Sequence, residues 1–286
     1  MKKLFLLLAF LLAGFNESFI SHSFSRSITG DTIKSLPQVN KEFLVVAHIV
    51  LGKDSSADIT QIQIIQALAE VNRAFAPIGV TFRLCQVDSI YNFQYNKLYG
   101  EGISVRDLEI DYMKEVYVQY NLKKRINLYY MSEFLKTYEP YCGFATLGGI
   151  ISNADERGIV IKKGCNTAIT LIHEFGHFFS LLHTFDKDNG IERVSRKNCL
   201  ETGDLVCDTP ADPYVENVPG YCIEQTCEFI YEGKDQDGQY YDPDLSNPMS
   251  YYGSCRCPKF TNGQLKKMAD FYTNYIEFHP GESVAW

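Results

Sequence analysis

The sequence has little positive charge and, after its first residues, no long hydrophobic run. Its 27 Lys and Arg residues are outnumbered by 35 Asp and Glu residues, which gives a formal net charge of −8. Because binding to a nucleic-acid backbone needs a basic patch and none stands out, we expect no nucleic-acid partner. A membrane-spanning helix needs about 20 consecutive apolar residues, and no later segment reaches that length. We therefore expect no membrane partner once the first segment is removed, and a monomeric protein.

The first 20 residues have the pattern of a secretory signal peptide. The basic start Met1–Lys3 is followed by the apolar run Leu4–Phe15, which is shorter than a membrane span. An uncleaved anchor is the alternative, and the cleavage point stays open between Ala13-Gly14 and the Ser-rich stretch Ser18–Ser27. We expect a protein secreted to the extracellular space or the periplasm, with residues 21–40 as a leader or flexible arm.

Nine cysteines are present, and export favours disulfide bonds between them. An odd total leaves at least one thiol free or paired with another chain. Six of the nine lie in one later stretch: Cys199, Cys207, Cys222, Cys227, Cys255 and Cys257. Structural zinc is the alternative, but the spacings within Cys222/Cys227 and Cys255/Cys257 match a Cys-x2-Cys ribbon poorly.

Runs with strand and helix character alternate in the first two thirds of the chain. Phe43–Leu51 predicts a buried strand, and apolar residues at helical spacing predict a helix over Ile59–Phe75, capped by Ser55, Ser56 or Asp58. The other expected strands are Val80–Val87, Ile126–Met131 and Gly158–Ile161, and the other expected helices are about Val105–Tyr120, Thr167–Ser180 and Asn262–Phe278. This alternation indicates an α/β layer with a mainly parallel sheet. The polar stretch Thr184–Thr261 is too long for one simple loop, so we expect its cysteines to staple it.

The sequence His173-Glu174-Phe175-Gly176-His177 lies inside one of these expected helices. Residues four apart share a helix face, so the imidazoles of His173 and His177 can both reach one zinc ion at about 2.0–2.1 Å. Glu174 is rotated by about 100° from His173. That position suits a general base beside a zinc-activated water better than a third ligand.

His183 is the third expected zinc ligand, and it requires the helix to end early. In a continuous helix it would lie about 15 Å beyond His173 and could not reach the same metal. The chain must therefore turn back after His177. The pattern His-Glu-x-x-His-x-x-Gly-x-x-His encodes such a turn, with glycine at the break. Ser180 occupies the glycine position here, and a left-handed backbone would cost serine about 1–2 kcal/mol more than glycine.

With these residues the sequence resembles the metzincin clan of metallopeptidases. A second stretch, Asn247–Tyr251 (NPMSY), resembles the Met-turn of that clan. The resemblance implies that Met249 lies under the three imidazoles as an apolar floor. It also implies that Tyr251 stabilises the oxyanion formed during hydrolysis. A core methionine and a surface tyrosine without such roles are the alternative.

Within this clan the sequence is similar to the pappalysin family, including its cytophagalysin- and ulilysin-like bacterial members. The resemblance covers about residues 40–280 and is carried by Leu171–Phe185, Gly203–Ala211, Asn247–Tyr251 and Phe260–Met268. It implies an α+β zincin fold whose catalytic domain spans residues 41–286. An upper α/β lobe (residues 41–183) would hold a twisted sheet and the zinc helix. An irregular, disulfide-stapled lower lobe (residues 184–286) would end in a helix.

The resemblance also implies structural calcium and two disulfides. Asp204, the Val206 carbonyl and Thr209 match calcium-binding positions of the family. Three such oxygens are too few without water or other loop oxygens, and a solvated turn is the alternative. The implied disulfides are similar to Cys199–Cys227 and Cys222–Cys255, with Cys207 and Cys257 as competing partners.

Together these features predict a secreted zinc metalloendopeptidase (EC 3.4.24 type) that acts on protein or peptide substrates. The substrate is expected to extend along an upper strand, at Phe144–Gly149 or near Ile150, and to add to its edge. One alternative is a non-catalytic secreted binding protein that contains zinc. Glu174 argues against it, because a structural zinc site does not need that carboxylate. The other alternative is a zinc hydrolase that acts on something other than peptides.

Overall fold

The computed structural model describes residues 35–99, 113–135, 141–153, 156–215, 218–223, 225–252 and 258–278. The expected signal peptide, most of the leader and the first half of the helix expected near residues 105–120 lie outside these ranges. Leu36–Trp286 forms one compact unit. Among the described residues, no helix is long and apolar enough to cross a membrane.

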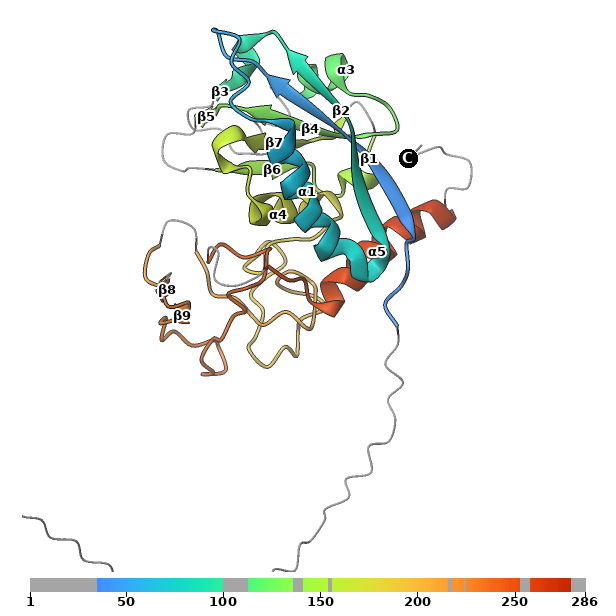
Figure 1. Cartoon of the computed structure of the whole chain (residues 1–286). Helices are drawn as coiled ribbons and strands as arrows, with labels where there is room; N and C mark the ends of the chain where they lie inside the picture. The colour runs from blue at the N-terminus through green and yellow to red at the C-terminus, as the bar shows by residue number, and fades with distance from the viewer. Residues whose placement is uncertain are drawn as a thin grey trace, which may run out of the picture. The chain divides into compact units, whose positions relative to one another are not determined.

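The regular elements follow the alternation seen in the sequence (Figure 1). In chain order they are β1 (Lys41–Val50), α1 (Gln61–Phe75), η1 (Ala76–Ile78), β2 (Val80–Ile90), η2 (Phe93–Asn96), β3 (Lys97–Tyr99), α3 (Lys114–Tyr120), β4 (Ile126–Met131), β5 (Glu133–Leu135), β6 (Gly143–Ala145), η4 (Gly149–Ile151), β7 (Ile159–Lys162), η6 (Lys163–Cys165), α4 (Ala168–Phe178), β8 (Cys222–Ile223), β9 (Glu228–Phe229) and α5 (Asn262–Phe278).

The main sheet has five strands in the order β2-β1-β4-β7-β6. The first four strands run parallel to their neighbours, whereas β6 runs antiparallel to β7. The prediction of a mainly parallel sheet is therefore confirmed. The short strand β6, whose partner in this sheet is β7, forms an edge of the sheet and overlaps the start of the segment Phe144–Gly149, one of the two edges expected for the substrate.

Side chains on both faces of the sheet are buried. Along β4, Leu128 and Tyr130 join a cluster with α1, α4 and α5, whereas Tyr129 and Met131 join a second cluster with α3. All six residues of β4 are buried, and apart from Asn127 they are apolar or aromatic, so the strand does not alternate between apolar and polar residues. Because α5 packs in the same cluster as α1 and α4, this helix completes the core that supports the zinc helix.

The first helix begins two residues later than the sequence suggested. Thr60 caps α1, and not Ser55, Ser56 or Asp58: its hydroxyl accepts from the Gln63 N–H at 3.3 Å, and the Gln63 side chain accepts from the Thr60 N–H at 2.8 Å. This capping box satisfies two N–H groups that no residue inside the helix can pair. The helix ends at Phe75, as expected, and Gly79 ends the following η1 with φ 68°.

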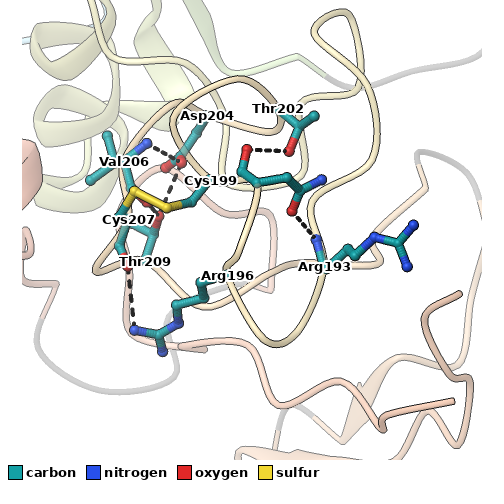
Figure 2. The surroundings of a disulfide bond; sticks show 9 residues. Arg193, Arg196, Cys199, Thr202, Asp204, Val206, Cys207 and Thr209 are labelled. Carbon is teal, nitrogen blue, oxygen red and sulfur yellow. Dashed lines mark hydrogen bonds between the residues drawn. A yellow bond between two sulfur atoms is a disulfide. The ribbon is translucent and has the colours of Figure 1, made fainter. Parts of the chain in front are cut away.

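The chain after α4 is irregular, as expected, and one disulfide staples it at close range. Cys199 pairs with Cys207, eight residues away, and their Cα atoms lie 5.0 Å apart (Figure 2). The expected Cys199–Cys227 disulfide is therefore wrong. Positive φ angles at Gly203 (64°) and Leu205 (61°) turn the chain back between the two cysteines. The expected Cys222–Cys255 pairing stays a prediction, because Cys255 lies outside the described residues.

Candidate functional site

Helix α4 carries the first two zinc-ligand candidates. Thr167 caps it by accepting the Thr170 N–H at 3.2 Å. Thr167, the first residue of the expected helix Thr167–Ser180, is therefore its N-cap. His173 and His177 lie four residues apart on one face, so both imidazoles point the same way.

The helix ends where the third histidine requires it to end. Ser180 has φ 77°, its N–H donates to His177 O at 2.8 Å, and the Leu181 N–H donates to Gly176 O at 3.0 Å. This pair of bonds is a Schellman motif, which normally places glycine in the left-handed position. The motif turns the chain back, and His183 returns to the face of α4 that bears His173 and His177.

The three imidazoles converge. The Nε2 atom of His177 lies 3.0 Å from the Nε2 atoms of both His173 and His183, and the remaining Nε2–Nε2 distance is 3.2 Å. A tetrahedral zinc ion bonded at about 2.0–2.1 Å holds such nitrogens about 3.3–3.4 Å apart. The nitrogen triangle therefore needs to open by only a few tenths of an ångström around the metal.

Hydrogen bonds on the far side of two rings fix their tautomers. The Nδ1–H of His173 donates to the Pro248 carbonyl at 2.6 Å, and that of His177 donates to the Leu181 carbonyl at 2.7 Å. In each ring the Nε2 lone pair then points toward the neighbouring Nε2 atoms. These lone pairs repel one another unless a cation lies between the nitrogens. Burial lowers the pKa of His173 to about 4 and that of His177 to about 3, and burial places the pKa of His183 well below 6.5. Neutral nitrogens in this arrangement fit zinc.

Glu174 lies beside the edge strand. Its side chain is buried, with 4% of the residue exposed. A Cβ atom added at Gly143 in β6 would meet Glu174 Oε1 at 3.0 Å and Val160 O at 2.8 Å. The absence of a side chain at Gly143 therefore makes room for the carboxylate. The Cys142–Cys165 disulfide, which was not expected, ties the residue before β6 to the segment just before α4.

The stretch Asn247–Tyr251 contacts the histidine-bearing segments and is hydrogen-bonded to two of them. Pro248 accepts the bond from His173, and the Met249 carbonyl accepts the Thr184 N–H at 3.1 Å, one residue after His183. Met249 is fully buried, and its Sδ atom would lie 2.5 Å from a Cβ atom at Gly176. The glycine inside the His-Glu-x-x-His sequence thus makes room for the methionine.

Tyr251 lies against the metal ligands. Its ring centroid is 4.7 Å from that of His183 and 5.5 Å from that of His173. Phe185 also stacks on the third ligand, with its ring 4.7 Å from the His183 ring and nearly parallel to it, and its ring centroid is 4.9 Å from that of Tyr251. Sequence reasoning had placed Tyr251 near the zinc but had missed Phe185.

The loop after the zinc helix gathers the oxygens expected to bind calcium (Figure 2). Thr209 Oγ1 lies 3.0 Å from Asp204 Oδ1 and 2.6 Å from the Val206 carbonyl, and one hydroxyl proton cannot serve both acceptors. Glu192, which the sequence did not reveal, lies beside this cluster. Burial raises the pKa of both carboxyls to about 7, and the Asp204 charge adds to the effect on Glu192.

Two family models match the chain. The model of peptidase family M43, described as pregnancy-associated plasma protein-A, matches residues 159–273. A model of reprolysin-like metallopeptidases of family M12B matches residues 61–184. The two matches meet in the segment that holds the histidines.

Relatives and a solved structure are similar over most of the chain. An extracellular metalloprotease of Verticillium alfalfae is 27% identical over 245 residues, which cover 81% of this chain and 75% of the relative. An extracellular metalloprotease of Pyricularia oryzae is 28% identical over 240 residues, covering 80% and 74%. Mature mirolysin of Tannerella forsythia, solved with a cleaved peptide, has the same fold, with a TM-score of 0.52 and 19% identity over 81% of this chain and 91% of that one.

The fold and the convergent histidines define a zinc metallopeptidase of the metzincin class. Three features support this assignment: the five-stranded sheet with its antiparallel edge strand, the zinc helix, and the third histidine that returns to the helix face. More narrowly, the chain is similar to peptidase family M43, the pappalysin family, whose model matches residues 159–273. The resemblance drawn from the sequence is confirmed.

Proposed function

We propose that this protein is a secreted endopeptidase that cleaves peptide bonds with His173, His177 and His183 as zinc ligands and Glu174 as general base. The observation that carries the proposal is the buried carboxylate one helix position after the first ligand and beside the edge strand β6. When bound, zinc would lower the pKa of a water toward about 7 and polarise the scissile carbonyl.

Glu174 performs both proton transfers. Its carboxylate takes a proton from the attacking water as the new carbon–oxygen bond forms. It then gives that proton to the leaving amine as the carbon–nitrogen bond breaks, so the carboxylate is restored. Tyr251, whose ring lies beside those of His173 and His183, donates a hydrogen bond to the oxyanion formed between these steps.

The substrate lies extended along β6. This strand forms an edge of the sheet next to Glu174, and an extended peptide can pair with the backbone of such an edge. The Cys142–Cys165 disulfide holds the start of β6 in place. Mirolysin was solved with a cleaved peptide, which supports a peptide substrate here. The two relatives are named extracellular metalloproteases, which supports secretion of this protein.

The test is Glu174→Gln, which keeps the size of the side chain and removes its basicity. Cleavage of a denatured protein substrate should fall by about 10²–10⁴-fold while one zinc per chain is retained. Glu201→Gln, an exposed carboxylate on the same chain, is the matched control and should cleave normally. Equal cleavage by wild type and Glu174→Gln would contradict the mechanism. If the zinc-loaded wild type cleaves nothing in a proteome-derived peptide library, the non-catalytic or non-peptidase alternative holds.

Calcium is the second metal of this proposal. Asp204, the Val206 carbonyl, Thr209 and Glu192 would hold it in the loop after the zinc helix. Both oxygens of Glu192 and Asp204 Oδ2 are buried and have no hydrogen-bond partner among the described residues. Oxygen ligands and two adjacent buried carboxylates suit a hard divalent cation, which would offset their desolvation and mutual repulsion.

A further inference from the structure

The third zinc ligand is held differently from the other two. His173 and His177 each donate an Nδ1–H to a backbone carbonyl. In the part of the chain that the structure describes, His183 makes no such bond, and its ring contacts those of Phe185 and Tyr251. A ligand without its own hydrogen bond depends on the segment that carries it. The contacts that hold the His183–Phe185 segment therefore set the position of the third ligand, and with it the affinity for zinc.

One buried carboxylate, Asp212, binds that segment. Its Oδ2 atom accepts the Thr184 hydroxyl at 2.7 Å, one residue after His183. Its Oδ1 atom accepts the Tyr252 hydroxyl at 2.5 Å, one residue after Tyr251. Oδ1 also accepts the Tyr214 N–H at 3.0 Å. Asp212 thus joins three segments that lie far apart in the sequence.

The hydrogen bond from the Tyr214 N–H to Asp212 supports the aromatic rings around His183. Tyr214 has its ring 4.9 Å from that of Phe185 and 5.9 Å from that of Tyr251. Both of these rings contact His183. By holding the Tyr214 backbone, Asp212 therefore also supports the aromatic side chains that press on the third ligand.

Because burying the Asp212 carboxylate costs free energy, the hydrogen bonds that it accepts are needed to keep it in place. Asp212 is 8% exposed, and a buried carboxylate destabilises a fold unless hydrogen bonds compensate it. Three donors converge on it, and two of them are side-chain hydroxyls that a mutation can remove singly without removing the charge. No step of the proposed hydrolysis uses this residue.

We propose that Asp212 is a positioning residue for the zinc centre, which acts through Thr184 on His183 and through Tyr252 on Tyr251. We call the hydrogen bond from the Thr184 hydroxyl to Asp212 the Thr184 arm, and the bond from the Tyr252 hydroxyl to Asp212 the Tyr252 arm. The Thr184 arm sets the affinity of the site for zinc. The Tyr252 arm sets the position of the Tyr251 phenol, and only this arm rests on the proposed peptidase function. The two arms therefore predict different defects.

Two single-hydroxyl deletions test the two arms. Thr184→Val should weaken zinc binding by about 10-fold in competition with a chromophoric chelator, as loss of an outer hydrogen bond does in other zinc sites. Tyr252→Phe should leave zinc affinity within about 2-fold and lower kcat for a peptide substrate by about 10-fold with little change in KM. Unchanged zinc affinity in Thr184→Val overturns the first arm, and unchanged kcat in Tyr252→Phe overturns the second.

Asp212→Ala removes both arms and is compared with a matched buried aspartate. Asp235 also accepts three N–H groups in the irregular part of the chain, from Val194, Asp237 and Gln239. Asp212→Ala should change the visible absorption bands of the cobalt-substituted protein, whereas Asp235→Ala should leave them intact. Equal spectra and equal zinc affinities in the two variants overturn the proposal. Because the cobalt spectrum and the zinc affinity need no cleavage, their outcome is separate from that of the peptidase test.

Discussion

The Nδ1 atom of His177 donates a 2.7 Å hydrogen bond to the carbonyl oxygen of Leu181. The carbonyl reaches the ring because Ser180, one residue earlier, adopts a left-handed backbone with φ 77°. The same turn brings His183 back to the metal-binding face. Termination of the helix and orientation of the second ligand are therefore one structural event, built at a position where this chain carries serine.

Ser180→Gly should stabilise the protein without changing zinc affinity. The left-handed backbone costs serine about 1–2 kcal/mol, and the greater freedom of an unfolded glycine offsets about 0.4–1 kcal/mol of the gain. Urea unfolding of the zinc-loaded protein should show a free energy of unfolding higher by about 0.5–1 kcal/mol. Ser152→Gly is the control: its φ is −77°, so it should lower stability. A loss of stability in both variants would show that the backbone at Ser180 is not strained.

Much of this site follows from local rules that a sequence displays. The limits of β4 and α5 match the prediction, and the Schellman turn appears at the position where the histidine spacing demands it. These features depend on apolar periodicity, on caps and on backbone geometry within a few residues. They are therefore visible before any tertiary contact is known.

The residues that sequence reasoning missed act across the fold. Asp212 and Glu192 resemble any loop carboxylate until burial and neighbours give them a role. Gly143 marks a place where a side chain would meet Glu174, a contact between a strand and a helix. The Cys199–Cys207 pairing depends on two left-handed residues that fold one loop back. None of these relationships has a spacing that a sequence pattern encodes.

Gly143→Ala should impair catalysis while sparing the metal. The new Cβ atom would approach Glu174 Oε1 to 3.0 Å and Val160 O to 2.8 Å, so the carboxylate or the edge strand must shift. A misplacement of about 1 Å at a reacting group costs roughly 10²-fold, so kcat/KM should fall by about 10–100-fold with zinc content unchanged. Gly164→Ala is the control, because nothing lies within 4 Å of its added Cβ atom. Normal kcat/KM in Gly143→Ala would mean that Glu174 has room to spare.

Gly176→Ala should destabilise the protein through Met249. A Cβ atom at this position would lie 2.5 Å from Met249 Sδ, and overpacking of a core costs about 1–3 kcal/mol. The higher helix propensity of alanine than of glycine stabilises the helix by about 1 kcal/mol and offsets part of this loss. In a Met249→Ala background the clash is gone, so the same change should be neutral or stabilising. Thermal unfolding of the four proteins should give a coupling free energy of about 1–3 kcal/mol, and additive effects would show that the two residues do not press on each other.

Calcium should raise the thermal stability of the zinc-loaded protein. At a calcium concentration about 100 times Kd, binding to the folded state alone adds about 2.7 kcal/mol, or roughly 5–10 °C in Tm. The double variant Glu192→Gln/Asp204→Asn lacks both buried charges, so its Tm should not respond to calcium. Its Tm in calcium-free buffer should equal or exceed that of the wild type, because two buried carboxylates no longer need desolvation.

The control for this experiment is Glu201→Gln, which removes an exposed carboxylate from the same loop and should keep the full response to calcium. Zinc content must be equal in all samples, since loss of zinc would also lower Tm. If calcium raises the Tm of the double variant as much as that of the wild type, the ion binds elsewhere, and Glu192 and Asp204 do not hold it. If no protein responds, the cluster of Asp204, Val206 and Thr209 is a turn stabilised by its own hydrogen bonds. Burial of the Glu192 carboxylate then destabilises this loop, and calcium does not offset that cost.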